Sequence, residues 1–133
     1  MLSLCPREKR PATLSLSILL LLGACATVPV PAEVHTQWLT GHWQGHDAAG
    51  WVYFLDVDDT GAFQQRISAP DSPACAQHGR MVPQSGRLHW DYTLNTCNEV
   101  YQGIRESFPV RVVDGRTFQQ ERPSYVVTYV RRR

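Results

Sequence analysis

RLHWDYTL, residues 87–94, alternates large apolar and polar side chains without interruption. Successive side chains of a β-strand point to opposite faces, so Leu88, Trp90, Tyr92 and Leu94 are predicted to face a core and the residues between them to face solvent. A helix would need its apolar residues three or four positions apart. This stretch therefore predicts a strand with one buried face.

Short runs with a similar period continue along the chain and are separated by turn residues. After residue 40 we find no run long enough for a persuasive helical period, and the spacing is typical of sandwiches and barrels. Short connections make sequence neighbours pair, and closure removes exposed edges. The sequence predicts an all-β fold, a small antiparallel meander β-barrel of eight or nine strands. Strands are expected at 43–46, 51–57, 62–68, 80–82, 87–94, 100–105, 108–113, 116–120 and 125–130.

The clearest hairpin signal is Asp114-Gly115 between two strand-like runs. Both central residues of a type I′ turn need a positive φ, which Asp and Gly tolerate. We therefore predict a type I′ turn at this position.

Residues 1–24 read as an export signal, with a basic start, the apolar run 14–22 and small residues before Cys25. The apolar run is shorter than the roughly 20 residues that span a bilayer. LGAC, residues 22–25, resembles the bacterial lipobox, at which a peptidase cuts before a lipid-modified cysteine. The resemblance implies a lipoprotein with palmitate-type acyl chains on Cys25. The alternatives are an ordinary signal peptide and an uncleaved anchor.

The residues after Cys25 give the expected location and domain boundaries. Ala26 stands where an Asp commonly retains such lipoproteins at the inner membrane, so the resemblance implies the inner leaflet of the outer membrane, facing the periplasm. Two prolines in 26–32 favour extended geometry. The expected organisation is a lipoprotein signal peptide at 1–24, a lipidated tether at 25–37 and a barrel domain at 38–133.

Cys75 and Cys97 remain once the two N-terminal cysteines are set aside. In an oxidising compartment such a pair forms a disulfide. Closing a 22-residue separation stabilises the fold by about 3 kcal/mol in the chain-entropy model. A metal site is the alternative, but it needs more ligands and the chain has no C-x-x-C.

Composition narrows the range of partners. Without residues 1–24 the chain keeps ten Arg, no Lys and eleven acidic residues, a formal charge of −1. A nucleic-acid binder would show a basic excess, so no nucleic-acid partner is expected.

Gly41-His42-Trp43 resembles the G-x-W signature that opens the first strand of lipocalins and other calycin-like barrels. Shorter likenesses to small bacterial lipocalin-like domains follow: residues 59–63 resemble their hairpin, 85–88 a later turn and 129–131 their closing strand. The resemblance implies a short helical turn at 33–39 and a structural cation–π pair of Trp43 with Arg131, worth about 0.5–2 kcal/mol. A barrel of this size holds one small ligand or is filled by its own side chains.

Most aromatic side chains are expected in the core. The alternative is that some of them line a pocket or a partner surface, because Tyr and Trp combine contact area with a polar group. The candidate ligand-binding residues are Trp43, Tyr53, Trp90, Tyr92 and Tyr101.

Motifs for metal binding and catalysis are weak. Residues 56–61 imitate the start of a calcium loop, but Ile67 stands where its Glu should be. His42 and His46 lack a third ligand fixed by spacing. No serine lies in a G-x-S-x-G elbow. We therefore expect no metal, no cofactor and no enzymatic activity.

Two functions remain open. The first is a lipid-anchored lipocalin-like barrel that binds a small apolar ligand or an envelope component at its mouth. The second is a protein-binding module, such as a lysozyme inhibitor or an immunity protein against a wall-degrading toxin. Such inhibitors usually insert a loop, and the candidates are 70–77 and 95–99.

Overall fold

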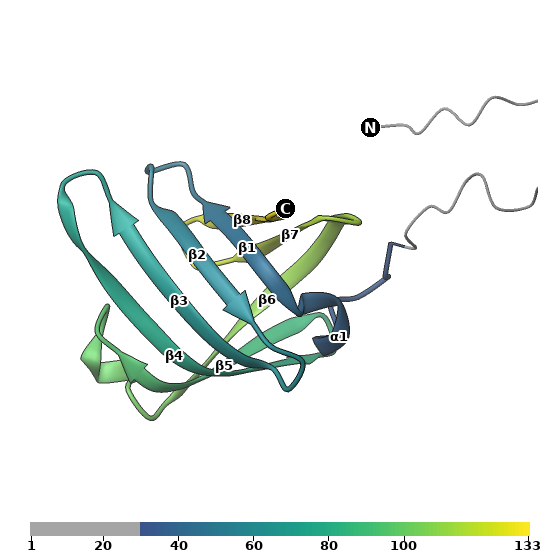
Figure 1. Cartoon of the computed structure of the whole chain (residues 1–133), viewed down its shortest axis with the longest axis horizontal. Coiled ribbons are helices and arrows are strands. Elements are labelled where there is room, and N and C mark those ends of the chain that lie inside the picture. Colours follow the sequence, from purple (N-terminus) through teal and green to yellow (C-terminus); the bar gives the residue numbers. More distant parts are fainter. Residues whose placement is uncertain (1–29) are drawn as a thin grey trace, which may run out of the picture.

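The computed structural model describes residues 30–133 as a closed barrel of eight antiparallel strands (Figure 1). Each strand pairs with the next along the chain, and β8 closes the barrel against β1. The all-β meander barrel with one disulfide is therefore confirmed, with eight strands. They are β1 (Gly41–His46), β2 (Val52–Val57), β3 (Ala62–Ala69), β4 (Ser72–Gln84), β5 (Arg87–Asn95), β6 (Arg105–Asp114), β7 (Thr117–Glu121) and β8 (Val126–Arg131), with helix α1 (Thr36–Leu39) and the 3₁₀ helix η1 (Glu99–Tyr101).

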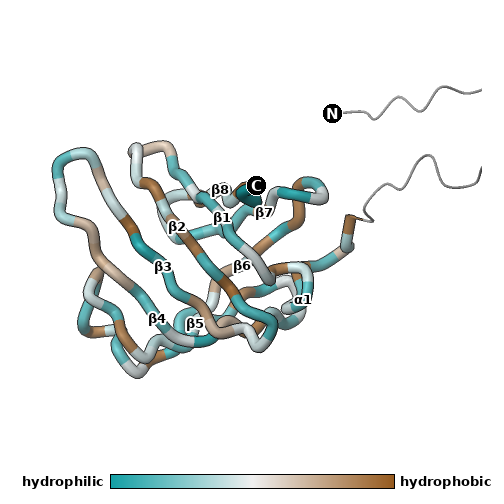
Figure 2. Tube along the Cα trace, in the orientation of Figure 1, coloured by the Kyte–Doolittle hydropathy of each residue, from teal (hydrophilic) through white to brown (hydrophobic). Residues whose placement is uncertain are grey.

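The core fills the inside of the barrel. Most strands alternate buried and exposed residues, as half-buried antiparallel strands do. Figure 2 accordingly shows apolar residues in short stretches distributed over the strands. The largest fully buried apolar side chains are Trp43, Trp90, Tyr129, Phe118, Leu39, Leu55, Met81, Leu88 and Val127.

Helix α1 lies at one end of the barrel, beside the β2–β3 turn (Figure 1). Trp38 from this helix packs 5.1 Å from Trp43, centroid to centroid. The Arg131 guanidinium lies 4.3 Å from the Trp43 ring and donates to the backbone carbonyls of Thr40 and Trp38. We call this the closed end. The turns at 47–51, 70–71, 96–104 and 122–125 lie at the opposite end, which we call the mouth.

A β-bulge in β5 changes which residues face the core. Gly79 pairs with Tyr92 but His78 pairs with Leu94, so Thr93 is an extra residue on β5. The extra residue reverses the alternation beyond it. The predicted inward position of Leu94 is therefore wrong, since Leu94 is only half-buried and Asn95 is buried instead.

Strand β4 is much longer than the predicted strand at 80–82. Residues 72–77 belong to it, so the expected loop at 70–77 is reduced to the two-residue turn at 70–71. Pro73 is tolerated because β4 pairs with β5 only from Gln77 onward. Before that residue β4 has one ladder neighbour, β3, and a proline N–H is not required on the free side.

The predicted strand at 100–105 is also wrong in its first part. Glu99–Tyr101 form η1, and Asn98 caps it by accepting from the Val100 N–H at 3.2 Å. The capping side chain and a positive φ at Gly103 turn the chain before β6 begins.

The type I′ turn is at Ser85-Gly86, where φ is 51° and 73°, and not at Asp114-Gly115. Neither Asp114 nor Gly115 has a positive φ. The Asp114 carboxylate instead accepts from the Arg116 N–H at 2.8 Å, which builds an Asx turn beside a bulge in β6.

Cys75 and Cys97 form the predicted disulfide, with Cα atoms 5.0 Å apart. They continue the β4–β5 pairing two residues beyond Gln77 and Asn95. The predicted signal, the lipid site and the first five residues of the tether fall in residues 1–29, outside the described part. Within residues 30–133 no helix is long and apolar enough to cross a membrane.

Candidate functional site

The half of the barrel next to the closed end is filled by aromatic rings. Phe118 lies 4.9 Å from Trp43 and 4.8 Å from Tyr129, and Phe63 lies 4.9 Å from Trp90, centroid to centroid. Edge-to-face and offset packing of this kind is favourable. These contacts occupy the interior that a long apolar ligand would need.

The mouth contains a cavity of about 540 Å³, which is within the size range of small-molecule sites. Every loop at the mouth except the β3–β4 turn contributes to it. Aromatic and apolar walls combine with two carboxylates, one guanidinium and several amides. The lining residues are Asp47, Ala49, Trp51, Tyr53, Ile67, Cys75, Gln77, Asn95, Cys97, Asn98, Tyr101, Glu106, Arg122, Ser124 and Tyr125.

Asp47 organises one side of the mouth. One carboxylate oxygen accepts from the Ala49 and Trp51 N–H groups, at 2.9 Å and 3.2 Å. The other accepts from the Tyr53 hydroxyl at 2.9 Å. Burial, and after it this hydrogen bond, raises the pKa of Tyr53. The Tyr53 hydroxyl thus stays the hydrogen-bond donor to Asp47 even at pH values at which an exposed tyrosine would ionise.

Glu106 and Arg122 form the other side. Their nearest charged atoms, Glu106 Oε2 and Arg122 Nη2, are 3.9 Å apart, which is too long for a hydrogen bond. Both side chains are shielded, with 14% and 23% exposure. The Arg122 guanidinium also lies 4.1 Å from the Phe108 ring. This loose pair leaves the Arg122 guanidinium free to bind a ligand, and the Glu106 carboxylate also accepts from the Tyr92 hydroxyl.

Buried amides form the floor of the mouth. Gln65 donates to Gln77 at 2.9 Å, and Gln77 donates to Asn95 at 3.3 Å. Tyr129 donates to the Gln65 carbonyl oxygen at 2.8 Å. Four strands thus contribute to one chain of hydrogen bonds across the barrel, which specifies how these polar side chains are oriented.

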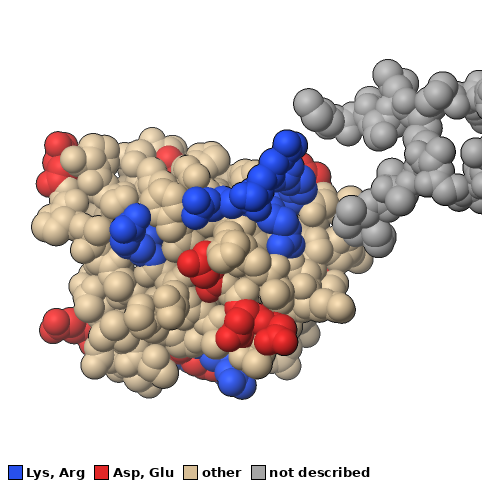
Figure 3. All heavy atoms as spheres, in the orientation of Figure 1, with Lys and Arg blue, Asp and Glu red and all other residues tan. Residues whose placement is uncertain are grey.

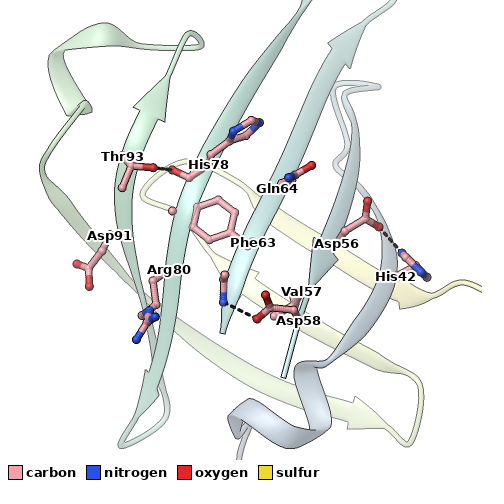
Figure 4. A pocket seen from close by; sticks show the side chains of 12 residues that line it. His42, Asp56, Val57, Asp58, Phe63, Gln64, His78, Arg80, Asp91 and Thr93 are labelled. Carbon is pink, nitrogen blue, oxygen red and sulfur yellow. Dashed lines mark hydrogen bonds and ion pairs between the residues drawn. The ribbon is translucent and has the colours of Figure 1, made fainter. Parts of the chain in front are cut away.

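A second, larger hollow of about 810 Å³ lies on the outer face of β1–β5 (Figure 4). Its charged groups other than Arg80 already pair with each other or with neighbours. His42 contacts Asp56, and Arg105 binds Asp91 through two hydrogen bonds of 2.6 Å and 2.8 Å. The hydrogen bond to Arg105 lowers the pKa of Asp91. Satisfied polar groups on an exposed face make this groove a weaker candidate than the mouth.

Arginines gather on the face near the ends of β1 and β8 (Figure 3), at a groove lined by Arg116 and Arg131–Arg133. Arg131 binds the closed end, and burial lowers its pKa. Arg116 donates to the Arg131 carbonyl at 2.9 Å, and Arg132 lies 5.5 Å from the Phe54 ring. These contacts give Arg116 and Arg131 a structural role.

The structure does not bring all five candidate ligand-binding residues together: two line the mouth cavity and three are buried in the core. Tyr53 and Tyr101 line the mouth. Trp43 and Trp90 lie in the filled half, and Trp90 donates to Gln120 at 2.7 Å. Tyr92 is buried beside Glu106, and burial with that carboxylate raises its pKa.

Sequence reasoning missed the polar residues of the mouth, Asp47, Gln77, Asn95, Glu106 and Arg122. A glycine inside a strand often marks a bulge, so Gly79 was the available signal for the inward position of Asn95. Nothing comparable marks Glu106 or Arg122. Among residues 30–133 no group of three or more His, Cys, Asp or Glu side chains could hold a metal.

The fold and the site define a small closed β-barrel with a mixed polar and aromatic cavity at one end. No family model, curated protein or solved structure matches this chain.

Proposed function

We propose that this chain is a lipid-anchored lipoprotein of the bacterial envelope whose barrel binds a small ligand or envelope component at the mouth. The cavity of about 540 Å³ is the observation that carries the binding proposal. The LGAC motif at 22–25 supports the anchor. Since the apolar half of the barrel is filled, the ligand would be compact, with polar groups beside an apolar face.

Binding is favoured over catalysis by the lining of the mouth. It contains no histidine, and its two cysteines are joined in the disulfide. A serine such as Ser124 therefore has no histidine beside it in the mouth to act as a base.

Metabolic labelling tests the anchor. A clickable palmitate analogue should mark the full-length protein, and Cys25→Ala should remove the mark. Cys5→Ala is the matched control and should keep it. An unmarked wild-type protein would exclude lipid anchoring.

Native mass spectrometry of protein taken from its own membrane tests ligand binding, together with displacement of a compact fluorescent aromatic probe. Tyr125→Ala removes an exposed ring of the mouth and should lower occupancy. Val126→Ala, the next and similarly exposed residue outside the lining, should not. Failure of both assays to show a bound species would remove the support for ligand binding.

A protein-binding module is the second candidate, favoured by the exposed apolar residues of segment 96–104. Val100, Ile104 and Tyr101 are 74%, 48% and 36% exposed, and the disulfide braces the start of this segment. Exposed apolar clusters mark interaction sites. The expected partner is a wall-degrading enzyme such as lysozyme.

An inhibition assay tests this candidate. Purified protein should inhibit lysozyme, and Val100→Asp with Ile104→Asp should abolish the inhibition. Gln102→Asp adds a charge to the same segment without removing an apolar side chain, and it should retain most of the effect. Inhibition that is absent, or that survives the double substitution, would exclude this use of the segment.

A further inference from the structure

Asn95 places a hydrogen-bond donor without a partner at the floor of the mouth. Its carbonyl oxygen accepts from Gln77 Nε2 and from the Cys97 and Asn98 N–H groups, at 3.3, 3.1 and 2.9 Å. Three donors on this one atom fix the orientation of the amide. The Asn95 Nδ2 group is then left without a partner in residues 30–133, although the side chain is only 1% exposed.

The chain of hydrogen bonds from Tyr129 through Gln65 and Gln77 ends at this amide. Each step donates in the same direction from strand to strand, so neighbouring bonds polarise one another. An unsatisfied buried donor is unfavourable by about 1–3 kcal/mol. An acceptor oxygen on a ligand would remove that penalty.

The charges of the lining restrict which kind of ligand can supply the acceptor oxygen for Asn95 Nδ2. Asp47 and Glu106 are acidic and Arg122 is the single basic residue of the lining, so the lining has an excess of one negative charge. An anionic headgroup is therefore disfavoured. The two carboxylates suit hydroxyl donors on a ligand, and the rings of Trp51, Tyr53 and Tyr125 suit a flat apolar face.

From these features we infer that the mouth binds a neutral N-acylated sugar unit, whose amide carbonyl accepts from Asn95 Nδ2. This inference rests on the proposed ligand-binding function and specifies its ligand. The sugar hydroxyls donate to Glu106 and Asp47, and the ring packs against the aromatic wall. A long acyl chain is excluded because Trp43, Phe118 and Tyr129 fill the space beyond the floor.

Three probes test the inference on the full-length protein in nanodiscs, with intrinsic tryptophan fluorescence as the readout, to which Trp51 in the lining contributes. They are N-acetylglucosamine, glucose, which lacks the acylated nitrogen, and dodecanoate. The wild-type protein should bind N-acetylglucosamine at least tenfold more tightly than glucose. Asn95→Asp keeps the carbonyl-type acceptor and removes the Nδ2 donor, and it should abolish this preference.

Asn98→Asp is the matched control. It adds the same charge at the mouth but keeps the acceptor that caps Val100, so the preference should persist. An equal preference in Asn95→Asp and wild type would overturn the inference, as would binding of dodecanoate without N-acetylglucosamine. In the second case ligand binding at the mouth would stand. If none of the three probes binds, the inference fails, while ligand binding at the mouth is decided separately by native mass spectrometry of the protein from its own membrane.

Discussion

Gly79 lies directly against the backbone of Asp91: a Cβ on Gly79 would stand 1.8 Å from the Asp91 carbonyl oxygen. Real Cβ atoms do not approach this closely, so only glycine fits. The close approach occurs beside the bulge at Thr93, where the β4–β5 pairing shifts. Gly79 therefore permits the shift that turns Asn95 into the barrel.

Replacing Gly79 should destabilise the whole barrel. We expect Gly79→Ala to lower the free energy of unfolding by about 2–4 kcal/mol, because β4 must move away from β5. Urea unfolding followed by circular dichroism measures the change. Gly86→Asn is the control, since Gly86 has open space around it and Asn tolerates a positive φ. Equal stability of Gly79→Ala and wild type would contradict the close approach.

Arg131 should be replaceable by no other residue without loss. It contacts the Trp43 ring and donates to the Thr40 carbonyl at 2.7 Å. Lysine keeps the charge but not the fork of donors, so Arg131→Lys should lower the free energy of unfolding by about 1–2 kcal/mol. Arg131→Met should lower it by about 2–4 kcal/mol.

Arg132→Lys is the matched control for this series. Arg132 is exposed and lies 5.5 Å from the Phe54 ring, so its replacement should change stability by less than about 0.5 kcal/mol. Thermal and urea unfolding give both values. Similar losses at Arg131 and Arg132 would argue against a special role for the Trp43 contact.

Loss of the disulfide should lower the stability of the whole fold, and the mouth should be the first part to open. Replacing Cys75 and Cys97 by Ala should lower the free energy of unfolding by about 3 kcal/mol. Hydrogen exchange should speed up first at Gln77 and Asn95, the pair next to the bridge. A reductant should reproduce the effect in wild type and leave the double variant unchanged; a reductant effect on both would point to another cause.

Alkaline pH should unfold the barrel through its buried tyrosines. Burial raises the pKa of Tyr53, Tyr92 and Tyr129 above the usual value of about 10. The unfolded chain then releases these protons first, so stability is unaffected below pH about 10 and falls as pH rises above it.

An absorbance titration in the near ultraviolet checks this sign. Fewer than all five tyrosines should ionise before unfolding, and the rest should ionise together with loss of the near-ultraviolet dichroism. Tyr129→Phe should reduce the cooperative part of the absorbance change. Ionisation of all five in a barrel that stays folded would refute the prediction.

Local sequence patterns were sufficient to predict the strands that bury only one face. The alternation in 87–93 and the redox argument for Cys75 and Cys97 correctly predicted β5 and the disulfide. The turn at Ser85-Gly86 was expected from the lipocalin-like resemblance alone. The positive φ angles of both residues in the structure show its type. Strand identity depends on neighbours in sequence, which is why it was predictable.

The mouth depends on contacts that the sequence does not display. The bulge at Thr93 reverses the period of two, so Asn95 rather than Leu94 faces inward. Glu106 and Arg122 are 16 positions apart in the chain and meet only because β6 and β7 pair. A single sequence carries the period of a strand, but not the register shift that decides which residues share a cavity.

Most of the aromatic contacts that hold the barrel together and the lining of the mouth lie at opposite poles. Helix α1, the Trp43–Arg131 contact and the aromatic stack occupy one pole, while the loops 47–51, 96–104 and 122–125 occupy the other. Apart from Cys97, whose disulfide stabilises the fold, changes in these loops leave the contacts of the closed end untouched. The architecture is thus a scaffold whose recognition could diversify, by evolution or by directed selection, without a matching cost in folding.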